Sequence, residues 1–174
     1  MKNTKNICIV GIGIALFVAL SMCLRIPVFE NYYLCLGYIV MSVYCYLYGP
    51  IYGTVVSVFG TILYCLLING LRGMPGWAIG NIIIGLIMGT WFKTIKGRKS
   101  IVLDALSIGM IVLSVSLGIL CCKSFIECIL YAQPMGVRVA NNIYAVVSDI
   151  VVLVASLPIC KRVDCVLRSR TVAY

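Results

Sequence analysis

Six apolar runs, separated by short polar segments, make up most of this chain. The runs cover about residues 7–24, 35–48, 51–68, 77–92, 101–121 and 139–160. A helix needs roughly 20 apolar residues to cross a bilayer, and the run over 35–48 is short by this measure. The pattern predicts an all-α integral membrane protein with six transmembrane helices, in a single domain over residues 1–174.

The clearest local pattern lies between Gly49 and Lys99, where two apolar runs flank a polar, glycine-rich turn. A Gly49-Pro50 pair precedes the first of them. Proline disfavours helix at the residue before it and fits the first turn of a new helix, so the pair predicts that one helix ends at Gly49 and another begins at Pro50. The second run carries two pairs of glycines at small-xxx-small spacing, namely Gly76/Gly80 and Gly85/Gly89. This spacing lets membrane helices approach closely, so the stretch predicts a tight two-helix hairpin.

The first apolar run carries a small residue at every fourth position: Gly11, Ala15, Ala19 and Cys23. Residues four apart share one face of a helix, so these four form a stripe. Two interpretations are open. The stripe either packs against another helix of the same chain or forms a docking face for a second membrane protein.

Composition excludes an ordinary soluble domain. The chain is 63% hydrophobic and 11% charged, with a mean hydropathy of +1.11, well outside the usual soluble range. The net charge of +9 could suggest nucleic acid binding, but the cations lie between apolar runs. Ten of the 14 Lys and Arg residues lie in the termini and in 93–99. By the positive-inside rule, both termini are therefore expected to be cytoplasmic.

Little in the sequence supports catalysis, a cofactor or a metal. The chain has no histidine and five acidic residues, scattered along it, so the common acid–base and nucleophile pairings are missing. Its ten cysteines show no paired CxxC spacing and lie mostly in apolar runs, where cysteine behaves as a small hydrophobe. No glycine-rich phosphate loop is present. We expect no enzymatic activity, no cofactor and no metal site.

Polar residues near the outer helix ends are the candidates for a binding site, because ionisable groups at membrane depth are costly and usually functional. The last run places Arg138, Asn142 and Asp149 on one helical face, and Asn81 lies one turn inside the fourth run. The full candidate set is Asn31, Arg72, Trp77, Asn81, Arg138, Asn142 and Asp149. These residues either line a pocket for a small ring-bearing ligand with an anionic or carbonyl group, or simply hold helices together.

The loop RIPV before an aromatic-rich run, the break YLYGPIYGTVVSVFGTIL and the segment PGWAIGNIIIGLIMG resemble the S component of energy-coupling factor (ECF) vitamin transporters. The resemblance implies a six-helix subunit of the bacterial cell membrane that captures a vitamin or related micronutrient on the extracellular side. It also implies docking, through Gly11, Ala15 and Ala19, to a transmembrane coupling subunit driven by two ATPases. Members for riboflavin, folate, cobalamin and queuosine share this pattern, so the substrate stays open.

Two other classes of function are compatible with the sequence. The chain could be a stand-alone channel or secondary carrier that uses Asp149 as a coupling carboxylate. It could also be a small membrane-embedded enzyme, such as a lipid-modifying transferase, or an assembly scaffold. Copurification with two ATPases and a coupling subunit would distinguish the ECF reading from these.

Overall fold

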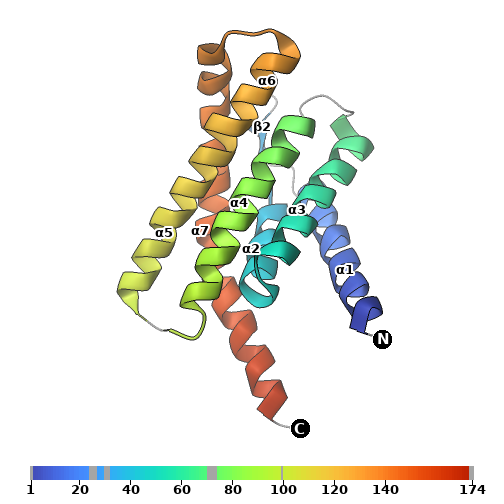
Figure 1. The fold of residues 1–174 in the computed structure, drawn as a ribbon, viewed down its shortest axis with the longest axis vertical. Helices are drawn as coiled ribbons and strands as arrows, with labels where there is room; N and C mark the ends of the chain where they lie inside the picture. Colours follow the sequence, from blue (N-terminus) through green and yellow to red (C-terminus); the bar gives the residue numbers. More distant parts are fainter. Residues whose placement is uncertain (1, 24–26, 30–31, 70–73, 99, 173–174) are drawn as a thin grey trace.

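The fold is a bundle of helices that lie side by side along the long axis of the molecule (Figure 1). The computed structural model describes residues 2–23, 27–29, 32–69, 74–98 and 100–172. The α-helices are α1 (Lys2–Cys23), α2 (Gly37–Tyr48), α3 (Pro50–Tyr64), α4 (Met74–Ile95), α5 (Ile101–Val115), α6 (Ser124–Tyr131) and α7 (Met135–Val172). Two π-helical segments, η1 (Cys65–Asn69) and η2 (Ser116–Lys123), continue α3 and α5. Strands β1 (Pro27–Phe29) and β2 (Tyr32–Tyr33) form a short antiparallel pair.

Five of the helical stretches are long and apolar enough to cross a membrane, which confirms the predicted all-α membrane architecture. They cover Thr4–Cys23, Pro50–Ile68, Met74–Ile95, Ile101–Tyr131 and Met135–Leu167. Helix α2 has only 12 residues, or about 18 Å at 1.5 Å per residue. A sixth crossing, by α2, therefore stays a prediction. Both termini lie at one end of the bundle, and the α6–α7 connection lies at the other (Figure 1).

The polar segment between the predicted runs 101–121 and 139–160 is mostly helical. Helix α5 continues through η2 into α6 without a break and ends at Tyr131, where Ala132 adopts a left-handed conformation with φ of 49°. Polar residues of this segment face the protein: Glu127 is 5% exposed and forms an i,i+4 ion pair with Lys123. Helix α7 likewise runs past the predicted end of the last run, near residue 160, to Val172.

Glycines bring α4 into contact with neighbours on two sides. A Cβ on Gly89 would lie 2.3 Å from the Pro50 Cα, and one on Gly85 would lie 2.5 Å from the Thr54 hydroxyl. These contacts confirm the predicted α3–α4 hairpin. Gly80 instead packs against the backbone of Gly118 in η2, because a Cβ on Gly80 would lie 2.8 Å from the Gly118 carbonyl oxygen. The Gly85/Gly89 pair thus contacts α3, whereas Gly80 contacts η2, so α4 packs between α3 and η2.

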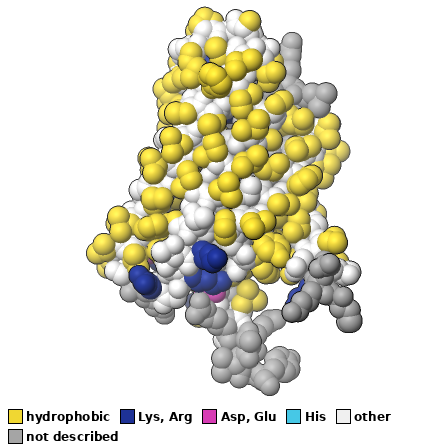
Figure 2. Space-filling model, viewed as in Figure 1, with side chains coloured by type: hydrophobic (Ala, Val, Ile, Leu, Met, Phe, Trp, Pro, Cys, Tyr) yellow, Lys and Arg dark blue, Asp and Glu magenta, His cyan; other side chains and the backbone are white. Residues whose placement is uncertain are grey.

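The surface of the bundle follows the membrane pattern expected from composition. Apolar side chains cover the visible sides of the molecule, and Lys and Arg side chains gather at the end where the termini lie (Figure 2). This sorting matches a bundle whose sides face lipid and whose basic end lies in the headgroup region.

Candidate functional site

A chain of hydrogen bonds joins α2, α3 and α4 inside the bundle. The Trp77 indole donates to the Tyr38 hydroxyl at 2.8 Å, and this hydroxyl donates to Asn81 Oδ1 at 2.8 Å. Asn81 Nδ2 then donates to the Thr61 hydroxyl at 2.7 Å. Tyr38, Thr61 and Asn81 are fully buried, whereas Trp77 is half-buried. We call these four residues the Tyr38 cluster.

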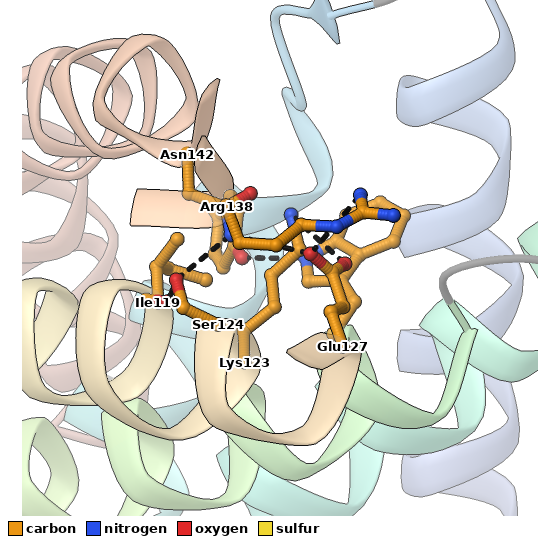
Figure 3. A network of polar contacts seen from close by, with 8 residues as sticks. Ile119, Lys123, Ser124, Glu127, Arg138 and Asn142 are labelled. Carbon is orange, nitrogen blue, oxygen red and sulfur yellow. Dashed lines mark hydrogen bonds and ion pairs between the residues drawn. The ribbon is translucent and has the colours of Figure 1, made fainter. Parts of the chain in front are cut away.

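A second polar group surrounds Glu127, where α6 meets the first turns of α7 (Figure 3). Glu127 Oε2 lies 3.8 Å from Arg138 Nη1 and 3.3 Å from Asn142 Nδ2, and its Oε1 lies 4.0 Å from Lys123 Nζ. Asn142 Nδ2 also donates to the Ser124 hydroxyl at 2.9 Å. We call Lys123, Ser124, Glu127, Arg138 and Asn142 the Glu127 cluster.

The π-helical segment η2 leads directly into the helix that carries most of this cluster. Wide turns of this kind are frequent at functional sites. The Ser124 hydroxyl donates to the carbonyl oxygen of Ile119, five residues back, at 3.2 Å, and so links the start of α6 to η2. Lys123, Ser124 and Glu127 then all face the protein interior rather than lipid.

Two buried atoms of the Glu127 cluster have no hydrogen-bond partner among the described residues: Arg138 Nε, a donor, and Asn142 Oδ1, an acceptor. Asn142 is 1% exposed. The orientation of its amide follows from the network, because the side that faces the Glu127 carboxylate must be the donor. A buried polar atom that is left unpaired costs about 1–3 kcal/mol, so such atoms require an explanation.

Asp149 links the two clusters. It is 5% exposed, and its carboxylate interacts electrostatically with Lys123 and with the Tyr38 hydroxyl. The described basic and acidic residues of the combined site are therefore Lys123 and Arg138 on one side and Glu127 and Asp149 on the other. Aromatic side chains lie close by: Tyr131 stacks under the Arg138 guanidinium at 4.8 Å, and Tyr64 packs edge-on against Trp77.

Five of the seven residues predicted from the sequence lie in this site. Trp77 and Asn81 belong to the Tyr38 cluster, Arg138 and Asn142 belong to the Glu127 cluster, and Asp149 lies between them. The other two, Asn31 and Arg72, lie outside the described residues.

The sequence prediction missed Tyr38, Thr61, Lys123, Ser124 and Glu127. Lys123 and Glu127 have i,i+4 spacing, which is the spacing of an ion pair along a helix. Nothing in the sequence separates Tyr38 from the three other tyrosines of α2, whose contacts depend on the fold.

The small-residue stripe on α1 lies on the outer surface of the bundle. Gly11, Ala15 and Ala19 are all exposed, and a Cβ on Gly11 would meet nothing within 4 Å. The inward face of α1 carries larger side chains: Phe17 is fully buried and packs edge-on against the Tyr38 ring. The stripe is therefore not used for packing among the described residues of the chain.

The sequence model of one protein family, described as "ECF-type riboflavin transporter, S component", matches residues 1–164. The chain belongs to this family. Its members are membrane subunits that give an ECF transporter its substrate specificity, rather than enzymes. The apolar helices agree with a multi-pass membrane protein.

Curated relatives include two proteins of the UPF0397 group from two strains of Streptococcus thermophilus. Each is 33% identical to this S component over 98 residues, which is 53% of the chain and 52% of the relative. The match thus spans about half the length of these relatives. No solved structure matches the chain.

Proposed function

We propose that this S component captures a small, vitamin-like molecule from the extracellular side and delivers it to an ECF module. The observation that carries the proposal is the unpaired donor and acceptor, Arg138 Nε and Asn142 Oδ1, inside an otherwise paired buried network. A ligand that accepts from one atom and donates to the other would satisfy both. This arrangement is typical of specific small-molecule sites, in which a few placed polar groups fix the ligand.

The surroundings of these atoms favour a flat ligand with a carbonyl or amide-like edge. Tyr131 and Trp77 offer aromatic surfaces on which a ring could stack. The described cations and anions of the site balance, which favours a carbonyl group on the ligand over a full negative charge. Riboflavin is the first ligand to test, because the family description names it and its ring carries both N–H and C=O groups.

The outer face of α1 is the proposed docking surface for the transmembrane coupling subunit. Two ATPase subunits bound to that coupling subunit would supply the energy for transport. Gly11, Ala15 and Ala19 form an exposed stripe of small residues on the face of α1 that points away from the bundle. Membrane helices associate closely through such small residues. The ligand site lies on the other side of α1, so docking and ligand binding use separate surfaces.

Ligand binding is tested first by mass spectrometry of small molecules released from the purified protein, and then by titration of riboflavin and other vitamins. Arg138→Ala and Asn142→Ala should each weaken binding about tenfold to a hundredfold, the effect of losing one buried hydrogen bond to a ligand. Asn141→Ala is the matched control, because Asn141 is the exposed neighbour on the same helix. Unchanged affinity in both test variants would remove the site from α7.

Docking is tested with Ala15→Trp, since a large side chain would cover the small-residue stripe on α1 and keep a partner helix at a distance. Copurification with the coupling subunit and ATPases, and uptake in cells, should fail, while ligand binding to the isolated chain persists. Gly109→Trp is the control, because Gly109 is equally open but lies on α5. Uptake driven by an ion gradient through the purified chain alone would contradict the proposal and favour a secondary carrier.

A further inference from the structure

A cavity that the proposed transport function does not use lies at the end of the bundle that holds the termini. Its volume is about 590 Å³, within the range of small-ligand sites. It is formed by the end of α2, the α4–α5 connection, the first turn of α5 and the last third of α7. The lining residues that matter here are Tyr46, Arg98, Ile101, Asp104, Lys161 and Cys165.

The cavity is open and ionic. Lys161 and Asp104 form an ion pair at 2.5 Å across its wall, and both side chains are about half exposed, at 48% and 46%. Arg98 is exposed and has no ion-pair partner among the described residues. Asp164 adds a second acidic group to the lining. Arg98 is thus the cation that remains available to a bound anion.

The wider surroundings are basic. The end of α4, the α4–α5 connection and the last third of α7 hold the described cations Lys93, Lys96, Arg98, Lys161 and Arg162, against the two acids Asp104 and Asp164. Figure 2 shows Lys and Arg side chains grouped there, next to an acidic one. Such a surface attracts anions at the membrane boundary by about 1 kcal/mol per cation.

An apolar surface begins at the edge of the cavity. Ile101 lines the cavity and is 88% exposed, and along the same helix Val102 and Leu106 are 65% and 49% exposed. These side chains belong to a helix that is apolar enough to face lipid. An occupant with a charged head in the cavity and hydrocarbon chains along α5 would satisfy both surfaces, whereas a free phosphate would use only the first.

We propose that this cavity binds the headgroup of an anionic phospholipid, with the phosphate on Arg98 and the acyl chains along α5. Clusters of Lys and Arg at the membrane boundary are a recurrent kind of surface for anionic lipid headgroups. The site is separate from the Tyr38 and Glu127 clusters, at the opposite end of the bundle. It does not depend on the identity of the transported molecule.

The test uses the full chain in nanodiscs of phosphatidylglycerol or phosphatidylcholine. Cys165 lines the cavity and is exposed, so its rate of alkylation, measured by peptide mass spectrometry, reports occupancy. Phosphatidylglycerol should slow alkylation of Cys165, and native mass spectrometry should detect its retention on the protein. Arg98→Gln should reduce this retention roughly fivefold, the effect of one cation at the surface. Lys93→Gln is the control, because it removes the same charge at the same end but outside the cavity lining.

Each alternative has its own signature. Equal loss of phosphatidylglycerol in Arg98→Gln and Lys93→Gln would mean diffuse attraction to basic residues and would overturn the proposal. Equal protection of Cys165 by phosphatidylcholine would exclude selection for anionic lipid. Protection by inorganic phosphate without lipid would assign the cavity to a free anion, and protection only after addition of the ECF partners would assign it to a protein contact. Filling the cavity with Cys165→Trp should abolish retention without changing ligand affinity at the other end.

Discussion

The Tyr38 hydroxyl holds together the hydrogen-bond chain inside the bundle, and its removal gives a sharp test of the site geometry. Tyr38→Phe keeps the ring, which packs edge-on against Phe17 at 6.4 Å, and removes only the oxygen. Asn81 Oδ1 then loses its donor, and the Trp77 indole loses its acceptor. Because Asn81 is fully buried, water cannot replace the lost bond there.

The expected loss follows from these environments. A buried acceptor left unpaired costs about 1–3 kcal/mol, while half-buried Trp77 can find water and adds little. For a protein of this size, each kcal/mol lowers the melting temperature by about 2–4 °C, so Tyr38→Phe should melt roughly 2–12 °C lower. Far-UV circular dichroism in detergent measures the transition without relying on the fluorescence of Trp77.

Two other tyrosines of α2 are matched controls. The Tyr44 hydroxyl donates one bond, to the Ile9 carbonyl oxygen at 2.9 Å, so Tyr44→Phe should have a smaller effect. Tyr48 is 43% exposed, so Tyr48→Phe should leave the melting temperature unchanged. A Tyr38→Phe protein that melts no lower than the Tyr48→Phe protein would refute the reasoning, because the buried chain of bonds would then contribute nothing.

Two further predictions concern packing and topology. Gly89→Ala should destabilise the protein by about 1–3 kcal/mol, because the new Cβ would clash with the Pro50 Cα. In the control Gly109→Ala the new Cβ meets no other atom, so this variant should be neutral or stabilised by up to about 1 kcal/mol through helix propensity. Equal shifts in melting temperature for the two variants would contradict this prediction. Reporter fusions or cysteine labelling should place Lys96 in the cytoplasm and Gln133 outside, and finding both on one side would contradict the orientation set by the cation bias.

The sequence predicts the helical membrane architecture well because that part of the fold depends on local properties. Apolar length gives the spans, and the Gly49-Pro50 pair gives the break between α2 and α3, where Gly49 has a φ of 96°. The glycine pairs of α4 predict close contacts, but which neighbour each pair meets depends on tertiary packing. Gly85 and Gly89 contact α3, whereas Gly80 contacts η2.

Polar residues inside a helix mislead a reading based on hydropathy. The segment around Lys123 and Glu127 carries charges between apolar residues, and it is helical; the charges pair with one another and with α7. The structure places Arg138, Asn142 and Asp149 on one helix, as their spacing along the chain predicts, and their role as binding residues stays a prediction.

The cations found along the sequence are not the same set as the cations that meet in the site. Four cations lie outside the termini and residues 93–99, namely Arg25, Arg72, Lys123 and Arg138, and the first two of these lie outside the described residues. The other two, Lys123 and Arg138, share Glu127, and Lys123 also interacts with Asp149. Asp149 is itself buried, and its charge and that of Lys123 have opposite signs. The site therefore holds two acidic residues, Glu127 and Asp149, beside its two described basic residues, so the net charge of the pocket cannot be read from the cations alone.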